Sequence, residues 1–184
     1  MFKGSFSAFL FFQVGATFAI ASLIIIYWQS QIYHQEPPFP HQYISIVAQH
    51  YPEFVVFRLS TVTGAALIVL GWFTNHFVLR TVAVEAGIDL KKYHPEIVLV
   101  VGTIGGLLLM GNTASIDTGD MNKNLHVFCA SKFFIVTFIA QIYNTVICAW
   151  LSDQTKLISK RNLYLKYFIL IMLLVQGIDS AIKA

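Results

Sequence analysis

Residues 54–79 decide the fold, and they read FVVFRLSTVTGAALIVLGWFTNHFVL. The run contains one Arg and no Lys, Asp or Glu, and it exceeds the about 20 apolar residues that cross a bilayer as a helix. Similar runs occupy 6–28, 97–116, 126–151 and 163–182. The sequence therefore predicts an all-α, polytopic membrane bundle with five transmembrane helices, in which residues 1–184 form a single domain.

The composition agrees with a membrane protein. Apolar residues make up 57% of the 184 positions and charged residues only 11%, whereas a soluble domain has about 25% charged residues. The net charge is only +3, with the basic residues in short segments, which argues against a nucleic-acid-binding surface. The segments between the runs are too short for a separate catalytic domain. Function must then lie within the membrane, in the loops or in a partner.

The distribution of Lys and Arg predicts the orientation. Most basic residues precede the first run, or lie between the second and third and between the fourth and fifth: Lys3, Arg80, Lys91, Lys92, Lys156, Lys160, Arg161 and Lys166. Segments rich in Lys and Arg stay on the cytoplasmic side or its equivalent. We therefore expect the N-terminus inside, with segments 29–52 and 112–126 outside.

Proline marks the expected starts of the second and third spans, as Pro52-Glu53 and Pro95-Glu96. Proline is tolerated at the first helical position, where its missing N–H would be unpaired in any case. An adjacent Glu is favourable at the positive end of the helix dipole.

The first outer segment contains the Pro-rich piece 36–40, which we expect to be extended. Ile44, Val47, Ala48 and Tyr51 then follow at helical spacing and predict one apolar face on a short helix. This helix would cover the helix ends, or it would present a surface to lipid or to a partner.

Three ionisable residues stand inside spans near the predicted outer leaflet: Arg58, Lys132 and Asp179. Such residues usually face the bundle interior or mark a functional site. Arg58 and Lys132 are candidates to pair with Asp117, Asp120 or Asp179, or to contact lipid phosphates. The alternative is that both long side chains snorkel toward the membrane surface.

Asp117, Asp120 and His126 in the second outer segment are candidate metal ligands or an acid/base set. The alternative is a solvated turn in which an Asn caps the fourth span. A bis-His haem formed by His76 and His126 is not expected, because the two residues lie at opposite ends of their spans. We expect no cofactor.

Small residues at a spacing of four predict close helix packing. Gly102 and Gly106 form a GxxxG pair in the third span, and Gly15 and Ala19 form a similar pair in the first. We expect seams within the bundle, the alternative being a face for a partner subunit. Uncharged polar side chains inside the spans are expected to form hydrogen bonds between helices: Asn75, Gln141 and Asn144.

Several short motifs follow one another in a distinctive order: Pro37-Pro38-Phe39-Pro40, Tyr43-Ile44-Ser45, Pro52-Glu53, Phe57-Arg58, His126 and Tyr143-Asn144. In this order the chain resembles the Frag/DRAM/Sfk family of multi-pass membrane proteins, which includes the post-GPI-attachment-to-proteins factor 2 branch, over about residues 5–155. The family usually has six spans, and its acidic-Thr-Gly element is replaced here by Ile46-Val47-Ala48. A partner would fill the place of a sixth helix, or the chain is a fragment.

The resemblance implies an endomembrane protein of the ER, Golgi or lysosome, acting in lipid-anchor remodelling, sterol or phosphoinositide homeostasis, or autophagy. It makes Arg58 and His126 functional candidates without implying a reaction. We expect a non-enzymatic protein that binds membrane lipids or scaffolds other subunits. The alternative is an accessory subunit of a large assembly, such as a respiratory complex of the mitochondrial inner membrane. A metal-dependent intramembrane hydrolase ranks third.

Overall fold

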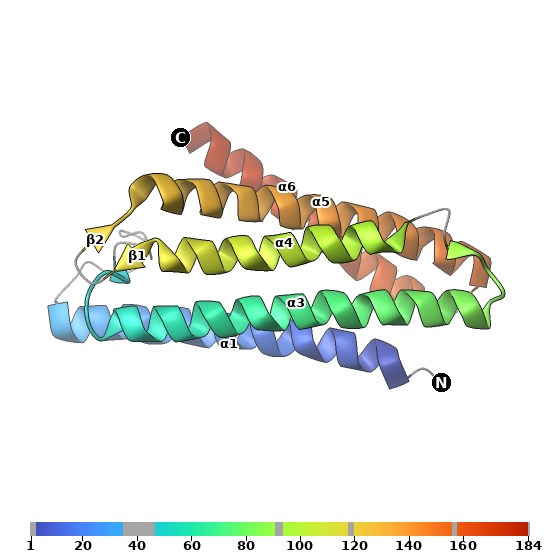
Figure 1. Ribbon diagram of the computed structural model, residues 1–184, viewed down its shortest axis with the longest axis horizontal. Helices are drawn as coiled ribbons and strands as arrows, with labels where there is room; N and C mark the ends of the chain where they lie inside the picture. Colours follow the sequence, from blue (N-terminus) through green and yellow to red (C-terminus); the bar gives the residue numbers. More distant parts are fainter. Residues whose placement is uncertain (1–2, 35–46, 91–93, 118–119, 156–157, 184) are drawn as a thin grey trace.

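The computed structural model describes residues 3–34, 47–90, 94–117, 120–155 and 158–183 (Figure 1). They form five long helices: α1 (Lys3–His34), α3 (Glu53–Glu85), α4 (Pro95–Ala114), α5 (Lys123–Thr155) and α6 (Lys160–Lys183). Two short strands, β1 (Ile116–Asp117) and β2 (Asp120–Met121), pair antiparallel and make a small hairpin between α4 and α5.

The predicted helical membrane fold is confirmed. Within the described residues, α3, α4 and α5 are long and apolar enough to cross a membrane. Large apolar side chains on the outside of the bundle are exposed, among them Leu59, Phe77 and Phe134. An apolar exterior is what a bilayer requires, because lipid tails are as apolar as these side chains.

The helices run alternately up and down, and each packs mainly on the next one along the chain (Figure 1). The seams of α1 with α3 and of α4 with α5 are extensive, whereas α6 packs less closely on α5. At one end of the bundle α1 and α4 stop, α3 and α5 start, and the hairpin lies between them. We call this the hairpin end.

Both predicted Pro-Glu starts are confirmed. Pro52 precedes α3, and Pro95 is the first residue of α4. The two Glu side chains differ, however. Glu96 is half exposed and pairs with Arg80 over 3.2 Å, while Glu53 is completely buried.

The short apolar face predicted before α3 is found only in part. Val47 and Ala48 are buried, but Tyr51 is 70% exposed. The His50 N–H donates to the Val47 carbonyl in a turn, so Tyr51 does not continue the face. Ile44 and the Pro-rich piece lie outside the described residues.

The GxxxG pair of α4 lies against α3. A Cβ atom added to Gly102 would come within 2.5 Å of the Trp72 ring, and one added to Gly106 within 2.5 Å of Val69 Cγ2. Both glycines are buried and allow the two helices to approach closely. The alternative that they form an exposed face for a partner subunit is wrong, because α3 already covers them.

The other small residues differ in how closely they contact a neighbouring helix. Gly105 faces Thr137 of α5, whose Oγ1 would lie 2.7 Å from an added Cβ. Gly15 of α1 faces Leu67 of α3 at 3.5 Å, an ordinary contact distance. The seam predicted for Ala19 is wrong, since Ala19 lies on the exposed side of α1.

A polar contact joins α3 and α5 within the bundle. Asn75 Nδ2 donates to Asn144 Oδ1 over 3.0 Å, and the buried Cys148 thiol lies 3.8 Å from the same oxygen. The predicted hydrogen bonding between helices is therefore confirmed for Asn75 and Asn144. The surrounding apolar cluster includes Trp72, Leu79, Val98, Ile147 and Leu151.

Candidate functional site at the hairpin end

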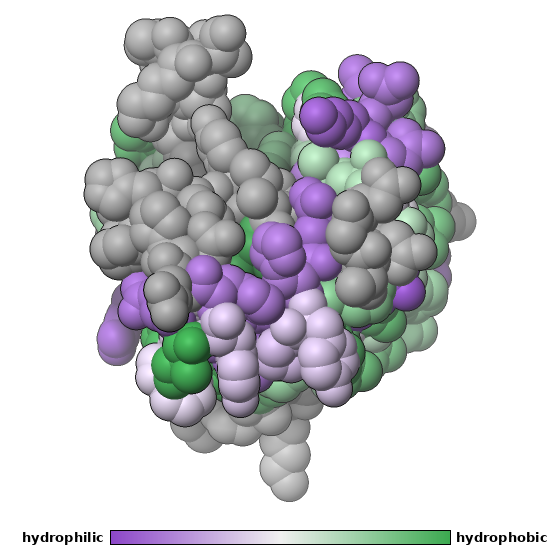
Figure 2. All heavy atoms as spheres, turned by 90° about the vertical axis from the view of Figure 1, so that its left-hand side faces the viewer, coloured by the Kyte–Doolittle hydropathy of each residue, from purple (hydrophilic) through white to green (hydrophobic). Residues whose placement is uncertain are grey.

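The hairpin end brings together two of the polar side chains for which the sequence predicts a function, Arg58 and His126. Among the residues that Figure 2 colours, hydrophilic side chains lie across the middle of this face and apolar ones mainly along its margin. Beneath it lies a second apolar cluster, formed by Ile26, Val47, Ala48, Phe57 and Ile116. The polar groups thus stand on a packed base that fixes their positions.

Arg58, in the second turn of α3, reaches across to the hairpin. Its Nη2 atom donates to the carbonyl oxygen of Ile116 over 2.9 Å, and its guanidinium carbon lies 4.4 Å from the centre of the Phe54 ring. The buried Nε atom has no hydrogen-bond partner among the described residues. Arg58 therefore keeps donor capacity that its protein contacts do not use.

His126, in the first turn of α5, bonds to the residue next to Ile116. Its Nδ1 lies 3.1 Å from Ser115 Oγ, which also makes a short hydrogen bond to the carbonyl oxygen of Asn112. A hydroxyl has one proton, and the short contact with a carbonyl requires it. Ser115 Oγ must then accept a hydrogen bond from the N–H at His126 Nδ1, which in the neutral ring leaves the lone pair on Nε2.

Arg58 of α3 and His126 of α5 therefore both contact the dipeptide Ser115-Ile116. Both residues of the dipeptide are buried. The Ser115 carbonyl also accepts the Asn122 N–H over 2.8 Å, and Asn122 Oδ1 caps α5 by accepting the Leu125 N–H over 3.1 Å. The predicted Asn cap on the fourth span is confirmed.

Lys132 and Asp179 do not join this arrangement in the described part of the chain. Lys132 is exposed on α5, and its Nζ lies 6.0 Å from the centre of the Phe128 ring, one turn closer to the hairpin end. This is the direction expected of a lysine that snorkels. The Asp179 side chain lies outside what the structure describes, as do those of Asp117 and Asp120.

The metal hypothesis receives no support from the residues that the structure describes. Among them, no group of three or more His, Cys, Asp or Glu side chains could hold a metal ion. His76 lies about six turns into α3, while His126 lies in the first turn of α5. Since both helices start at the hairpin end, the two imidazoles are roughly 30 Å apart in depth.

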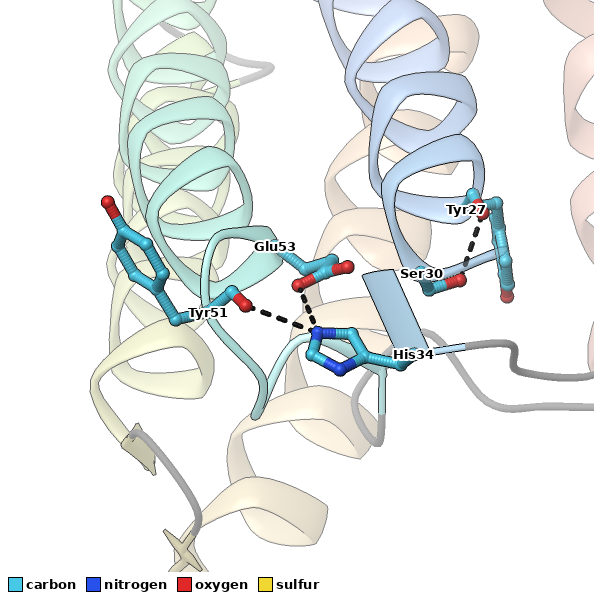
Figure 3. Close-up of polar contacts among 5 residues, drawn as sticks. All are labelled: Tyr27, Ser30, His34, Tyr51 and Glu53. Carbon is cyan, nitrogen blue, oxygen red and sulfur yellow. Dashed lines mark hydrogen bonds and ion pairs between the residues drawn. The ribbon is translucent and has the colours of Figure 1, made fainter. Parts of the chain in front are cut away.

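A second polar cluster at this end was not predicted from the sequence. His34, the last residue of α1, places Nε2 3.2 Å from Glu53 Oε2 and 3.2 Å from the Tyr51 carbonyl oxygen (Figure 3). The His50 ring lies 4.9 Å from the His34 ring, centre to centre. In the sequence, the available signal is that His34 and His50 lie on either side of the Pro-rich piece, with His50 just before Pro52-Glu53.

The chain matches one family model along nearly its full length. No curated protein and no solved structure matches it. The matching family model is that of the Frag1/DRAM/Sfk1/Cwh43P N-terminal domain, and it covers residues 5–178. The match includes α3, the hairpin and α5, and with them Arg58 and His126. The chain therefore belongs to the Frag1/DRAM/Sfk1/Cwh43P N-terminal domain family.

Proposed function

We propose that this chain is a non-enzymatic integral membrane protein that binds anionic lipid at the hairpin end. The observation that carries the proposal is Arg58. Its guanidinium is fixed by Ile116 and Phe54, and among the side chains that the structure describes, which exclude those of Asp117, Asp120 and Asp179, no carboxylate pairs with it.

The chemistry of arginine suits a phosphate headgroup. The guanidinium presents five N–H donors in a planar fork that matches phosphate oxygens. One donor is used by the Ile116 carbonyl, which orients the group and leaves others for a ligand. Arg58 also lies near the start of a helix suited to cross a membrane, where lipid phosphates are found.

The orientation is part of this proposal. We infer five spans, an inside N-terminus and an outside hairpin in an endomembrane, because the basic residues Arg80, Lys160 and Arg161 lie toward the opposite end of the bundle. Cysteine labelling of sealed vesicles tests this orientation. With the hairpin on the accessible side, a membrane-impermeant maleimide should label Asn124→Cys, and it should label Glu85→Cys only after permeabilisation.

Lipid retention tests the role of Arg58. The protein is reconstituted in nanodiscs of phosphatidylcholine with a minority of phosphatidylinositol or phosphatidylserine, released into mild detergent and analysed by native mass spectrometry. Arg58→Gln should lower the retained anionic lipid roughly tenfold, as expected for loss of a charged hydrogen bond. Arg58→Lys should retain an intermediate amount.

Matched controls separate this site from general charge effects. Arg80→Gln removes an exposed arginine at the other end of the bundle, and Lys132→Gln removes an exposed lysine on α5. We expect Arg80→Gln to match wild type and Lys132→Gln to have a smaller effect than Arg58→Gln. Equal retention by wild type and Arg58→Gln would refute the proposal.

A second candidate function is that of an accessory subunit in a larger membrane assembly, including one of the mitochondrial inner membrane. It is favoured by α6, which packs mainly on α5 and exposes Phe168, Ile171 and Leu174. Extraction in mild detergent followed by mass spectrometry distinguishes the two functions. Partners in fixed stoichiometry would favour the subunit, and a small particle carrying only lipid would favour the first proposal.

A further inference from the structure

His34 and Glu53 join the end of α1 to the start of α3. The Nε2 and Oε2 atoms are 3.2 Å apart, although the two residues are 19 positions apart in sequence. Figure 3 shows the imidazole placed between the Glu53 carboxylate and the Tyr51 carbonyl. This contact lies at the hairpin end of the extensive seam between α1 and α3.

The geometry fixes one proton of the pair. Both the carboxylate and the Tyr51 carbonyl are acceptors, and the carbonyl can never donate. His34 Nε2 must therefore carry a proton and share it between the two oxygens. The variable proton is the one on Nδ1, which decides whether the ring is neutral or a cation.

The burial of Glu53 makes this second proton important. Its side chain is 0% exposed, whereas that of His34 is 28% exposed. Glu53 Oε1 has no hydrogen-bond partner among the described residues. A buried carboxylate is costly unless it is paired and hydrogen-bonded. With Glu53 ionised, a neutral His34 leaves the pair with one uncompensated negative charge, whereas an imidazolium balances it.

We propose that His34 and Glu53 form a proton-dependent clasp that holds the end of α1 against the start of α3. The clasp tightens when the His34 ring becomes a cation and loosens when it is neutral. Histidine is the side chain that changes charge between about pH 5 and 8. The stabilisation is therefore present at mildly acidic pH and is lost as the pH rises.

Among the residues that the structure describes, the other ionisable groups near His34 and Glu53 oppose the clasp or do not reach it. The His50 ring, 4.9 Å from the His34 ring, opposes a second positive charge, so the cluster holds one added proton better than two. Arg58, on the same helix as Glu53, directs its guanidinium to Ile116 instead. Tyr51 contributes only its backbone carbonyl.

Thermal unfolding in vesicles of phosphatidylcholine alone tests the clasp. These vesicles contain no anionic lipid, so the result is independent of the proposed lipid site. Wild type should melt about 3 °C lower at pH 8 than at pH 6. His34→Gln and Glu53→Gln should melt at the same temperature at both pH values. His50→Gln, the matched control, leaves both clasp residues in place and removes only a neighbouring ring, so it should keep a pH-dependent shift at least as large as that of wild type.

A spectroscopic measurement on the wild-type protein covers the case in which a variant does not fold. The histidine rings and Glu carboxyl carbons are isotope-labelled and followed by solid-state NMR over the same pH range. We expect the His34 ring to become a cation while Glu53 stays ionised. The clasp is refuted if His34 stays neutral at pH 6, if Glu53 stays protonated throughout, or if folded His34→Gln keeps the wild-type pH dependence.

Discussion

Arg58 Nη2 donates a hydrogen bond over 2.9 Å to the carbonyl oxygen of Ile116, 58 residues further along the chain. The bond ties the second turn of α3 to the first residue of β1. A two-residue strand has few hydrogen bonds of its own, so contacts of this kind determine where the hairpin lies.

Loss of this bond should destabilise the protein even without lipid. In neutral detergent, we expect Arg58→Gln to lower the free energy of unfolding by about 1–3 kcal/mol, because the buried Ile116 carbonyl loses its charged donor. Arg80→Gln should change it by less than about 1 kcal/mol, since the Arg80–Glu96 pair is exposed. Denaturant titration of both variants measures the difference. Equal stabilities would mean that water or another donor replaces Arg58.

The close approach of α4 to α3 predicts that Gly102 does not accept a larger side chain. Gly102→Ala should destabilise the bundle by about 1–3 kcal/mol, because its Cβ would overlap the ring of Trp72, which is only 2% exposed. Gly64→Ala in α3 is the control, since nothing lies within 4 Å of its added Cβ. That substitution should be neutral or stabilise the helix by up to about 1 kcal/mol. Thermal unfolding compares the two, and a harmless Gly102→Ala would contradict the close α3–α4 seam.

The bond from His126 to Ser115 predicts which substitutions the site accepts. Asn places an N–H₂ group close to the position of the imidazole Nδ1, whereas Ala removes the donor. We expect His126→Asn to keep most of the stability of wild type and His126→Ala to lose about 1 kcal/mol. The comparison is made by thermal unfolding in detergent. If both variants lose the same stability, the Nδ1–H assignment is wrong.

The polar contact between Asn75 and Asn144 is suited to a double-mutant cycle. Asn75→Leu, Asn144→Leu and the double variant should show a coupling of about 0.6 kcal/mol, the average for hydrogen bonds between membrane helices. Unfolding in bicelles provides the free energies. A coupling near zero would show that the two side chains act independently.

The apolar runs and the helix starts could be predicted from the sequence, because both depend on local chemistry. Pro52, Pro95 and the Asn cap act on the first turn of their own helices. The end of α1 could not be predicted in the same way. Its apolar run stops at Trp28, yet the helix continues to His34, and Ser30 is buried there and donates to the Tyr27 carbonyl.

The candidate site was predictable only residue by residue. The sequence marks Arg58 and His126 as separate candidates. Their contacts with the dipeptide Ser115-Ile116 depend on how α4 places the hairpin between α3 and α5. Glu53 was predicted only to interact with the helix dipole. Its burial against His34 depends on α1, which is joined to α3 through residues 35–52, so no local pattern indicates it.

The packing of each helix mainly on its chain neighbour has a consequence for synthesis. When a helix leaves the ribosome and enters the bilayer, the surface that receives it has already been made. The bundle can then assemble in the order of translation, because the main contacts of each described helix are with a helix next to it in the chain. Because α6 packs mainly on α5, the α1–α3, α3–α4 and α4–α5 seams can form before α6 enters the membrane.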